Sequence, residues 1–230
     1  MRTQRIGSNF ALVALALAAA CAPAREAPPP EGTPATQQTP AQTPAAQTQP
    51  GTGTTGQTAA LACTPSERMP VEGRTSAYDS TMVMVGGAQA KVCYGRPAAR
   101  GRTMIGGEAV PYGQLWRTGA NEPTIIHLPF AAEIAGVRVE PGSYSLYTIP
   151  GEQEWTVIVN RSISQWGHES QYTEQVRAQE VGRGTVRSER TDSPVETFTI
   201  RSEPGAQDRA SLLLEWENTR VRIPVVRRST

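Results

Sequence analysis

The sequence predicts an all-β domain over residues 63–230, a single antiparallel β-sandwich or barrel-like fold with at most a short helix. Apolar and polar residues alternate with the period of two that is typical of half-buried strands, and turn signals rich in glycine and proline separate these runs. Many short strands at such spacing are typical of a sandwich or a barrel. A signal peptide over residues 1–20 and a disordered tether over residues 21–62 are predicted to precede the domain.

The strand pattern is clearest in the second half of the chain. In the run SYSLYTI, Tyr144 and Leu146 alternate with Ser145 and Tyr147, and a Pro-Gly turn precedes the run. Proline within the last run, at position 224, predicts that this strand lies at a sheet edge or ends in a bulge. Moderate helical character is confined to residues 170–180. The strand-like runs are residues 143–149, 154–160, 195–200, 209–216 and 219–226.

The N-terminus has the order of a secretory signal. Arg2 and Arg5 precede an apolar run over residues 10–20, which ends in three alanines. The run is about half of the roughly 20 residues that a spanning helix needs, so it is not predicted to be a permanent transmembrane segment. We therefore expect an exported protein whose mature chain begins after residue 20.

Cys21 follows the three alanines directly, and the sequence LAAAC resembles a lipobox, where bacteria attach diacylglycerol to a cysteine and cut before it. This resemblance implies lipidation at Cys21 and a membrane as partner, on the periplasmic or outer-membrane side. Ala22 is compatible with outer-membrane sorting. The alternative is a cysteine that falls by chance at an ordinary A-x-A cleavage site.

The stretch after Cys21 has the composition of a tether. Residues 22–62 consist mainly of Ala, Pro, Thr, Gln and Gly, and they contain one large aliphatic side chain, Leu61. Such a segment cannot bury enough apolar surface to offset the entropy of ordering it. We expect it to act as a flexible spacer between the anchor and the domain.

The chain has three cysteines, an odd number for an exported protein. If Cys21 carries a lipid, Cys63 and Cys93 are left to pair. A disulfide that closes a loop of about 30 residues stabilises a fold by roughly 3 to 4 kcal/mol in the chain-entropy model. The alternative is two buried free thiols, which are less typical of an oxidising compartment.

A series of motifs carries a family resemblance. The elements YGRP, VPYG and WRTGAN are followed in order by PGSYSLYTIPG, EWTVIVN, WG and VETFTI. From about Ser76 to Val225 the chain resembles the bacterial family catalogued as domain of unknown function 2911. The resemblance implies a compact β domain, often in exported proteins, and it implies no particular activity.

Residues 95–124 also hold a candidate ligand site, because they combine arginines with glycines and aromatic side chains. Arginine forks bind carboxylate or phosphate with two hydrogen bonds, and an aromatic ring offers a stacking surface for an anionic small molecule or a glycan. In the alternative structural interpretation, the arginine at position 117 is paired internally, the asparagine at 121 bonds loop backbone and the tryptophan at 116 belongs to the core. The candidate ligand-binding residues are Arg96, Arg102, Tyr112, Trp116, Arg117 and Asn121.

Signatures of catalysis are sparse. The two histidines, His127 and His168, lack a metal-binding spacing, and there is no G-x-S-x-G motif. The formal net charge of +1 does not favour a nucleic-acid partner. We expect no cofactor and no metal site, and we interpret the domain as a non-catalytic binding or structural module at the cell envelope. The alternative is an envelope hydrolase with a site near Arg102, Arg117, Asn121 and His168.

Overall fold

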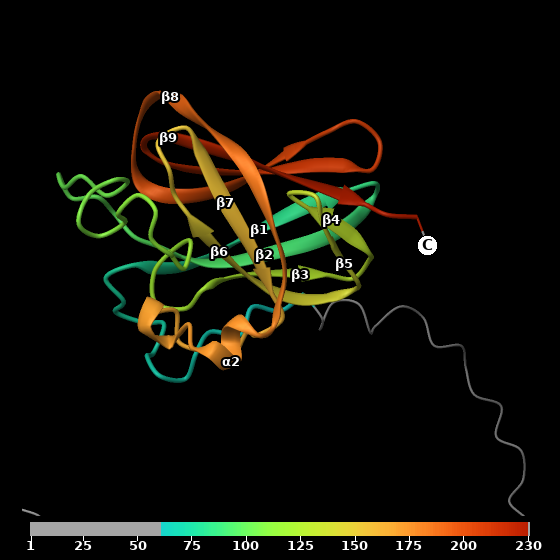
Figure 1. Cartoon of the computed structure of the whole chain (residues 1–230), viewed down its shortest axis with the longest axis horizontal. Helices are drawn as coiled ribbons and strands as arrows, with labels where there is room; N and C mark the ends of the chain where they lie inside the picture. Colours follow the sequence, from blue (N-terminus) through green and yellow to red (C-terminus); the bar gives the residue numbers. More distant parts are fainter. Residues whose placement is uncertain (1–60, 230) are drawn as a thin grey trace, which may run out of the picture. The chain divides into compact units, whose positions relative to one another are not determined.

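The computed structural model describes residues 61–229, which form nine strands, β1 to β9, in one antiparallel sheet. The order across the sheet is β1-β2-β3-β6-β7-β8-β9-β4-β5 (Figure 1). This confirms the predicted all-β class. The predicted signal peptide, the lipid site at Cys21 and the tether up to residue 60 lie outside the described residues.

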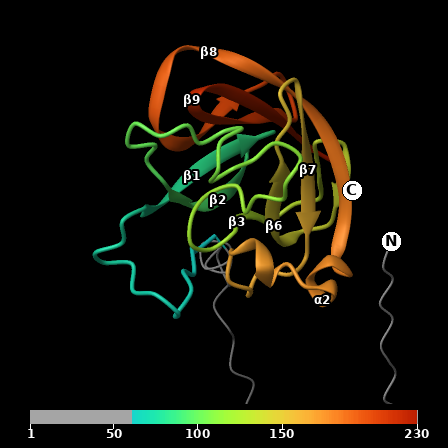
Figure 2. The same cartoon turned by 60° about the vertical axis from the view of Figure 1, so that its left-hand side comes forward.

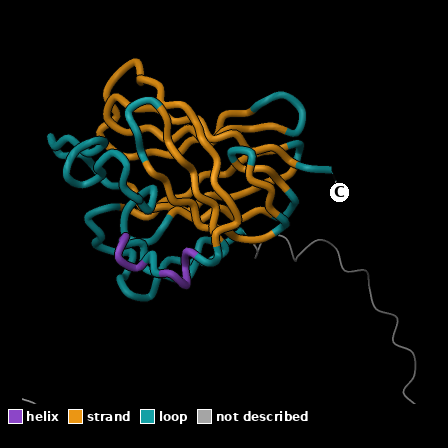
Figure 3. The backbone as a smooth tube through the Cα atoms, in the orientation of Figure 1, coloured by secondary structure: helices purple, strands orange, loops and turns teal. Residues whose placement is uncertain are grey.

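The helical content is small and lies at one end of the sheet (Figure 3). It consists of a 3-10 turn, η1 (Glu169–Gln171), and one turn of helix, α2 (Glu174–Arg177). These two elements are shorter than the stretch over residues 170–180 that has helical character in the sequence. The strands are β1 (Ala77–Val85), β2 (Ala88–Arg96), β3 (Thr124–Leu128), β4 (Ala132–Ile134), β5 (Val137–Val139), β6 (Gly142–Ile149), β7 (Glu154–Asn160), β8 (Glu180–Pro204) and β9 (Arg209–Arg227).

Two long strands bend the sheet into a barrel-like shape. The first part of β8 pairs with β7, and from Ser188 onward β8 pairs with β9, with register shifts between Arg190 and Thr199. β8 and β9 contact β1 at the opposite end of the sheet order, and both curl over it in Figure 2. The hydroxyl of Tyr94 in β2 accepts a hydrogen bond of 3.0 Å from the Ile200 amide in β8. The core is therefore enclosed between β1 and β2 on one side and β8 and β9 on the other.

Pro224 lies where β9 changes partner. The ladder between β9 and β8 reaches Val221, and from Val225 onward β9 pairs with β4. Proline has no N–H to donate, but its carbonyl still accepts, here from the Ala135 amide at 2.9 Å. The proline therefore marks a change of neighbours within a long strand.

Four aromatic rings form a cluster within the core. Trp116 stacks on Trp216 with the ring centroids 5.9 Å apart, and Phe198 and Trp155 meet it edge-on. Each of these side chains is nearly completely buried. Such pairs add about 0.5 to 1.5 kcal/mol each beyond the area that they bury, so this cluster is a major source of stability.

The outer face of the sheet is covered at β6 and β7. Tyr147 and Ile158 point to this face and pack against Tyr172 and Val176 from the segment that holds η1 and α2. Asn160 ties the segment down, since its Nδ2 donates to the Val176 carbonyl at 2.7 Å. None of the helices between residues 61 and 229 is long and apolar enough to cross a membrane.

Candidate functional site

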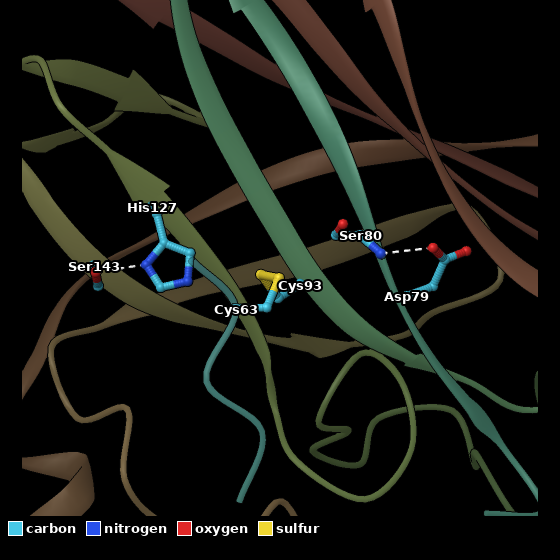
Figure 4. Close-up of a disulfide and its surroundings, with 6 residues drawn as sticks. All are labelled: Cys63, Asp79, Ser80, Cys93, His127 and Ser143. Carbon is cyan, nitrogen blue, oxygen red and sulfur yellow. Dashed lines mark hydrogen bonds between the residues drawn. A yellow bond between two sulfur atoms is a disulfide. The ribbon is translucent and has the colours of Figure 1, made fainter. Parts of the chain in front are cut away.

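Residues 63–76, here called the strap, form the loop that precedes β1 (teal in Figure 2). A disulfide joins Cys63 at the start of the strap to Cys93 in β2, with the two Cα atoms 5.7 Å apart (Figure 4). The pairing that the cysteine count predicts is thus confirmed. The bond fixes the first residue of the strap to the sheet.

A buried ion pair fixes the other end of the strap. The guanidinium of Arg74 meets the carboxylate of Glu122 with two hydrogen bonds of 2.9 Å, and the side chains are only 1% and 5% exposed. The backbone amide of Ser66 donates to the same carboxylate at 2.7 Å, and the Pro70 carbonyl accepts from Arg74 Nε at 2.9 Å. The strap is therefore held at both ends by strong, buried contacts.

Between the strap and the sheet lies a cavity of about 490 Å³. One wall is the strap, the floor is β3, and the opposite wall is the loop after β7. Three of its eleven lining residues are apolar, and the other eight are polar or charged. The lining residues are Thr64, Pro65, Ser66, Glu67, Arg68, Glu122, Ile125, His127, Ile163, Ser164 and Gln165.

His127 is the polar side chain of the cavity floor. It is 7% exposed, and its Nδ1 lies 2.7 Å from the hydroxyl of Ser143 in β6. Its Nε2 is buried and has no hydrogen-bond partner among the described residues. Figure 4 shows the ring beside Ser143, with Nε2 on the side away from that hydroxyl. A buried polar atom without a partner is uncommon and marks a place where a ligand or a water can bind.

The protonation of His127 follows from its surroundings. Burial lowers the pKa of the His127 imidazole below its ordinary value of 6.5, and the positive charge of Lys91, its cross-strand neighbour in β2, lowers it further. The ring is therefore neutral at pH 7. A neutral imidazole has one donor and one acceptor nitrogen, and the Ser143 hydroxyl can donate or accept. The cavity can thus present Nε2 as a donor or as an acceptor.

This pKa shift predicts a pH dependence of stability. In the unfolded chain the imidazole binds a proton at about pH 6.5, whereas the folded state resists protonation. The stability is therefore fully present above pH 6.5 and decreases as the pH falls through that value. We expect the melting temperature of the wild type to decrease more steeply between pH 8 and pH 5.5 than that of His127→Phe, as measured by circular dichroism.

Other titrating groups act in a different window. The carboxyl pKa values of Glu180 and Glu215 are lowered, with hydrogen bonds from Arg183 lowering the first and hydrogen bonds from Arg201 and Arg220 outweighing burial at the second. Their contributions are lost only as the pH falls below about 4.5. Parallel pH profiles for the wild type and His127→Phe above pH 5.5 would contradict the prediction.

Of the candidate ligand-binding residues, Arg96 and Arg102 bind different groups of the protein. Arg96 at the end of β2 binds the Asp79 carboxylate at 3.0 Å and the Thr199 hydroxyl at 3.1 Å. Arg102 donates to the carbonyls of Ala98 and Ala99 in its own loop. It also lines a separate cavity of about 410 Å³ together with Glu108. The guanidinium group of Arg96 is therefore engaged inside the protein, and that of Arg102 is partly engaged.

The two aromatic candidates have opposite environments. Trp116 is 3% exposed in the aromatic core, and its indole N–H donates to the Gly119 carbonyl at 3.2 Å. Tyr112 is 43% exposed, and its ring covers Gly106, where a Cβ atom would meet it at 2.5 Å. The two rings are not brought together on one surface.

Arg117 and Asn121 do come together, and they meet the segment with His168. Arg117 pairs with Glu169 at 3.5 Å, and the Asn121 carbonyl accepts from the Gly167 amide at 3.0 Å. A Cβ at Gly167 would meet that carbonyl at 2.3 Å, which explains the glycine of the WG motif. The exposed His168 caps η1 and lies 2.8 Å from the Ser170 hydroxyl. The hydrolase alternative thus has three of its four residues in one region.

Sequence reasoning missed the cavity under the strap. His127 stands in the apolar run TIIHLPF and lacks a metal-binding spacing, so the sequence alone does not single it out. One feature of the sequence could have placed His127, namely the alternation of side chains along a strand with a period of two. Ile126 and Leu128 belong to the core, so Ile125 and His127 must face the other side of the sheet. Nothing in the sequence shows that the strap returns to cover that side.

Among residues 61–229, no group of three or more histidine, cysteine, aspartate or glutamate side chains could hold a metal ion. No curated protein and no solved structure matches the chain. A model of the family described as "Protein of unknown function (DUF2911)" matches residues 76–225. This range runs from the last residue of the strap almost to the end of β9, and it includes the WRTGAN loop and His127. The chain belongs to the DUF2911 family.

Proposed function

We propose that this chain is an exported lipoprotein whose β domain is a non-catalytic binding module displayed at the cell envelope. The anchor in this proposal is diacylglycerol on Cys21, and residues 22–62 form the spacer. The ligand site in this proposal is the cavity under the strap.

The Cys63–Cys93 disulfide is the observation that carries the proposal. Stable structural disulfides are typical of proteins that fold outside the reducing cytosol. The bond uses two of the three cysteines, so the remaining one is Cys21, in the lipobox-like sequence LAAAC. The cysteine arithmetic and the N-terminal signal pattern therefore support the same place in the cell.

A binding role is supported by the cavity. Its volume of about 490 Å³ is within the range of about 300 to 1,000 Å³ that is usual for small-molecule sites. Of the two ligand classes that the sequence suggests, the geometry favours the uncharged glycan. The guanidinium groups of Arg74 and Arg96 hydrogen-bond to carboxylates within the domain, and Arg117 Nε lies 3.5 Å from the Glu169 carboxylate without a hydrogen bond, so each of these charges already faces an acid.

The anchor gives the direct test. We expect the mature protein to carry acyl chains on Cys21 and to enter the detergent phase in a phase-separation experiment. Cys21→Ser should move it to the aqueous phase, whereas the neighbouring control Ala22→Ser, which keeps the cysteine, should not. Mass spectrometry of the N-terminal peptide measures the modification. An unmodified Cys21 on a soluble mature protein would exclude lipidation.

A further inference from the structure

We propose that the cavity between the strap and β3 is a site for an uncharged, hydroxyl-rich ligand of the size of a disaccharide, and that His127 Nε2 is its central hydrogen-bonding group. The inference rests on the proposed binding function and specifies the chemistry of the ligand. The reasons are the position of the cavity, the unpartnered imidazole, the charge balance and the rigidity of the strap.

The cavity is separate from the core that stabilises the sheet. Ile126 and Leu128 of β3 point into the main core, whereas Ile125 and His127 alternate to the outer face and form the cavity floor. Ile163 on the opposite wall is 38% exposed. Ile125 and Ile163 therefore give the cavity apolar patches within a mainly polar lining, and such patches suit the C–H faces of a sugar ring.

His127 provides the polar contact. Its Nε2 is buried and unpartnered, and its other nitrogen is satisfied by Ser143 at 2.7 Å. The two hydrogen positions between His127 and Ser143 give Nε2 either a donor or an acceptor role. A ligand hydroxyl can both donate and accept, so it fits either arrangement. A ligand hydroxyl here gives Nε2 a hydrogen-bond partner that none of the described residues supplies.

Two other polar side chains of the cavity, Glu122 and Gln165, are already engaged within the domain. Both oxygens of Glu122 are bound by Arg74, and Ser66 adds a backbone amide. The side-chain amide of Gln165 donates to the Tyr147 hydroxyl at 3.1 Å and to a backbone carbonyl. At the rim, the strap places an acidic residue, Glu67, next to a basic one, Arg68. The cavity therefore presents one buried free hydrogen-bonding group and no net charge, which disfavours a carboxylate or phosphate.

The strap gives the site a fixed wall. The disulfide holds it at Cys63 and the ion pair holds it at Arg74, so the lining segment between these residues is bound at both ends. A preorganised wall reduces the entropy that is lost on binding.

The test uses the full mature chain with Cys21→Ser, which keeps it soluble. Maltose, cellobiose and N,N′-diacetylchitobiose are titrated by calorimetry, and the His127 imidazole resonances are followed by NMR. We expect at least one disaccharide to bind and to shift these resonances. His127→Phe should weaken binding about tenfold, as expected for the loss of one hydrogen bond. The matched control, His168→Phe, changes an exposed histidine that does not line the cavity and should leave binding unchanged.

A second variant keeps the test valid if His127→Phe does not fold. Ile163→Trp adds bulk at an exposed position on the cavity wall, and it should block binding while the melting temperature stays the same. Binding that survives both His127→Phe and Ile163→Trp would overturn the site. Binding of inorganic phosphate in preference to all three sugars, or no binding of any sugar, would overturn the ligand class. Both results are distinct from failure of the anchor, which the mass of the N-terminal peptide reports separately.

Discussion

Replacing Arg74 with methionine is expected to lower the free energy of unfolding by about 3 to 5 kcal/mol. The substitution leaves the Glu122 carboxylate, 5% exposed, with a single remaining hydrogen bond, from the Ser66 amide. A buried charge without its partner is strongly destabilising because its desolvation is no longer offset. The loss also frees the C-terminal end of the strap. Urea unfolding of the oxidised protein measures the effect.

Two further variants separate this cause from others. Arg138→Met removes an exposed pair, since Arg138 is 73% exposed and binds Glu133 at 3.2 Å, and it should cost less than about 1 kcal/mol. Combining Arg74→Met with Glu122→Leu removes both charges and should recover most of the stability. If the double variant is no more stable than Arg74→Met, the buried charge is not the cause.

Replacing Trp116 with alanine is expected to cost about 3 to 5 kcal/mol of stability. The indole stacks on Trp216 and meets Phe198 and Trp155 at their edges, so its removal leaves a large cavity at the centre of the core. It also removes the donor to the Gly119 carbonyl, which is part of the WRTGAN loop. Thermal and urea unfolding, followed by near-ultraviolet circular dichroism, measure the loss.

The same experiment decides between the two sequence-based interpretations of this residue. Tyr112→Ala, at an exposed position in the same segment, is the control and should cost about 1 kcal/mol or less. If Trp116 were instead a stacking platform for a ligand, alanine would abolish binding and leave the melting temperature nearly unchanged. A melting temperature within a degree of the wild type would therefore contradict the packing role.

The strands that sequence predicts best are those whose neighbours lie close in the chain. Residues 143–149 and 154–160 become β6 and β7 with almost the same bounds, because their period of two is visible locally and a short turn joins them. The sequence pattern of residues 180–194 does not predict a strand. They are rich in charge and glycine, and they are extended because they pair with β7 and β9. Their pairing partners, rather than their own pattern, decide their structure.

The candidate site shows the same limit. Arg96, Trp116 and Arg117 lie within about 20 residues of one another in sequence, but the fold directs them to the end of a strand, to the core and to a loop. Residues that are close in sequence need not be close in space here, because neighbouring strands of this sheet come from distant parts of the chain. Conversely, the cavity joins residues 64–68 to His127 and Gln165, which no local motif relates.

The amino-acid sequence alone predicted the all-β class and the family, because strand alternation and motif order are properties of the chain itself. The cysteine count favoured the pairing of Cys63 with Cys93 over two free thiols, and the structure decided for the pairing. Only the tertiary structure decided which polar groups are satisfied. Arg74 finds Glu122 across 48 positions, and His127 is left with a buried, unpartnered nitrogen under the strap. The physical reason is that hydrogen bonds and ion pairs act over a few ångströms in space, and the path of the whole chain determines which groups come that close.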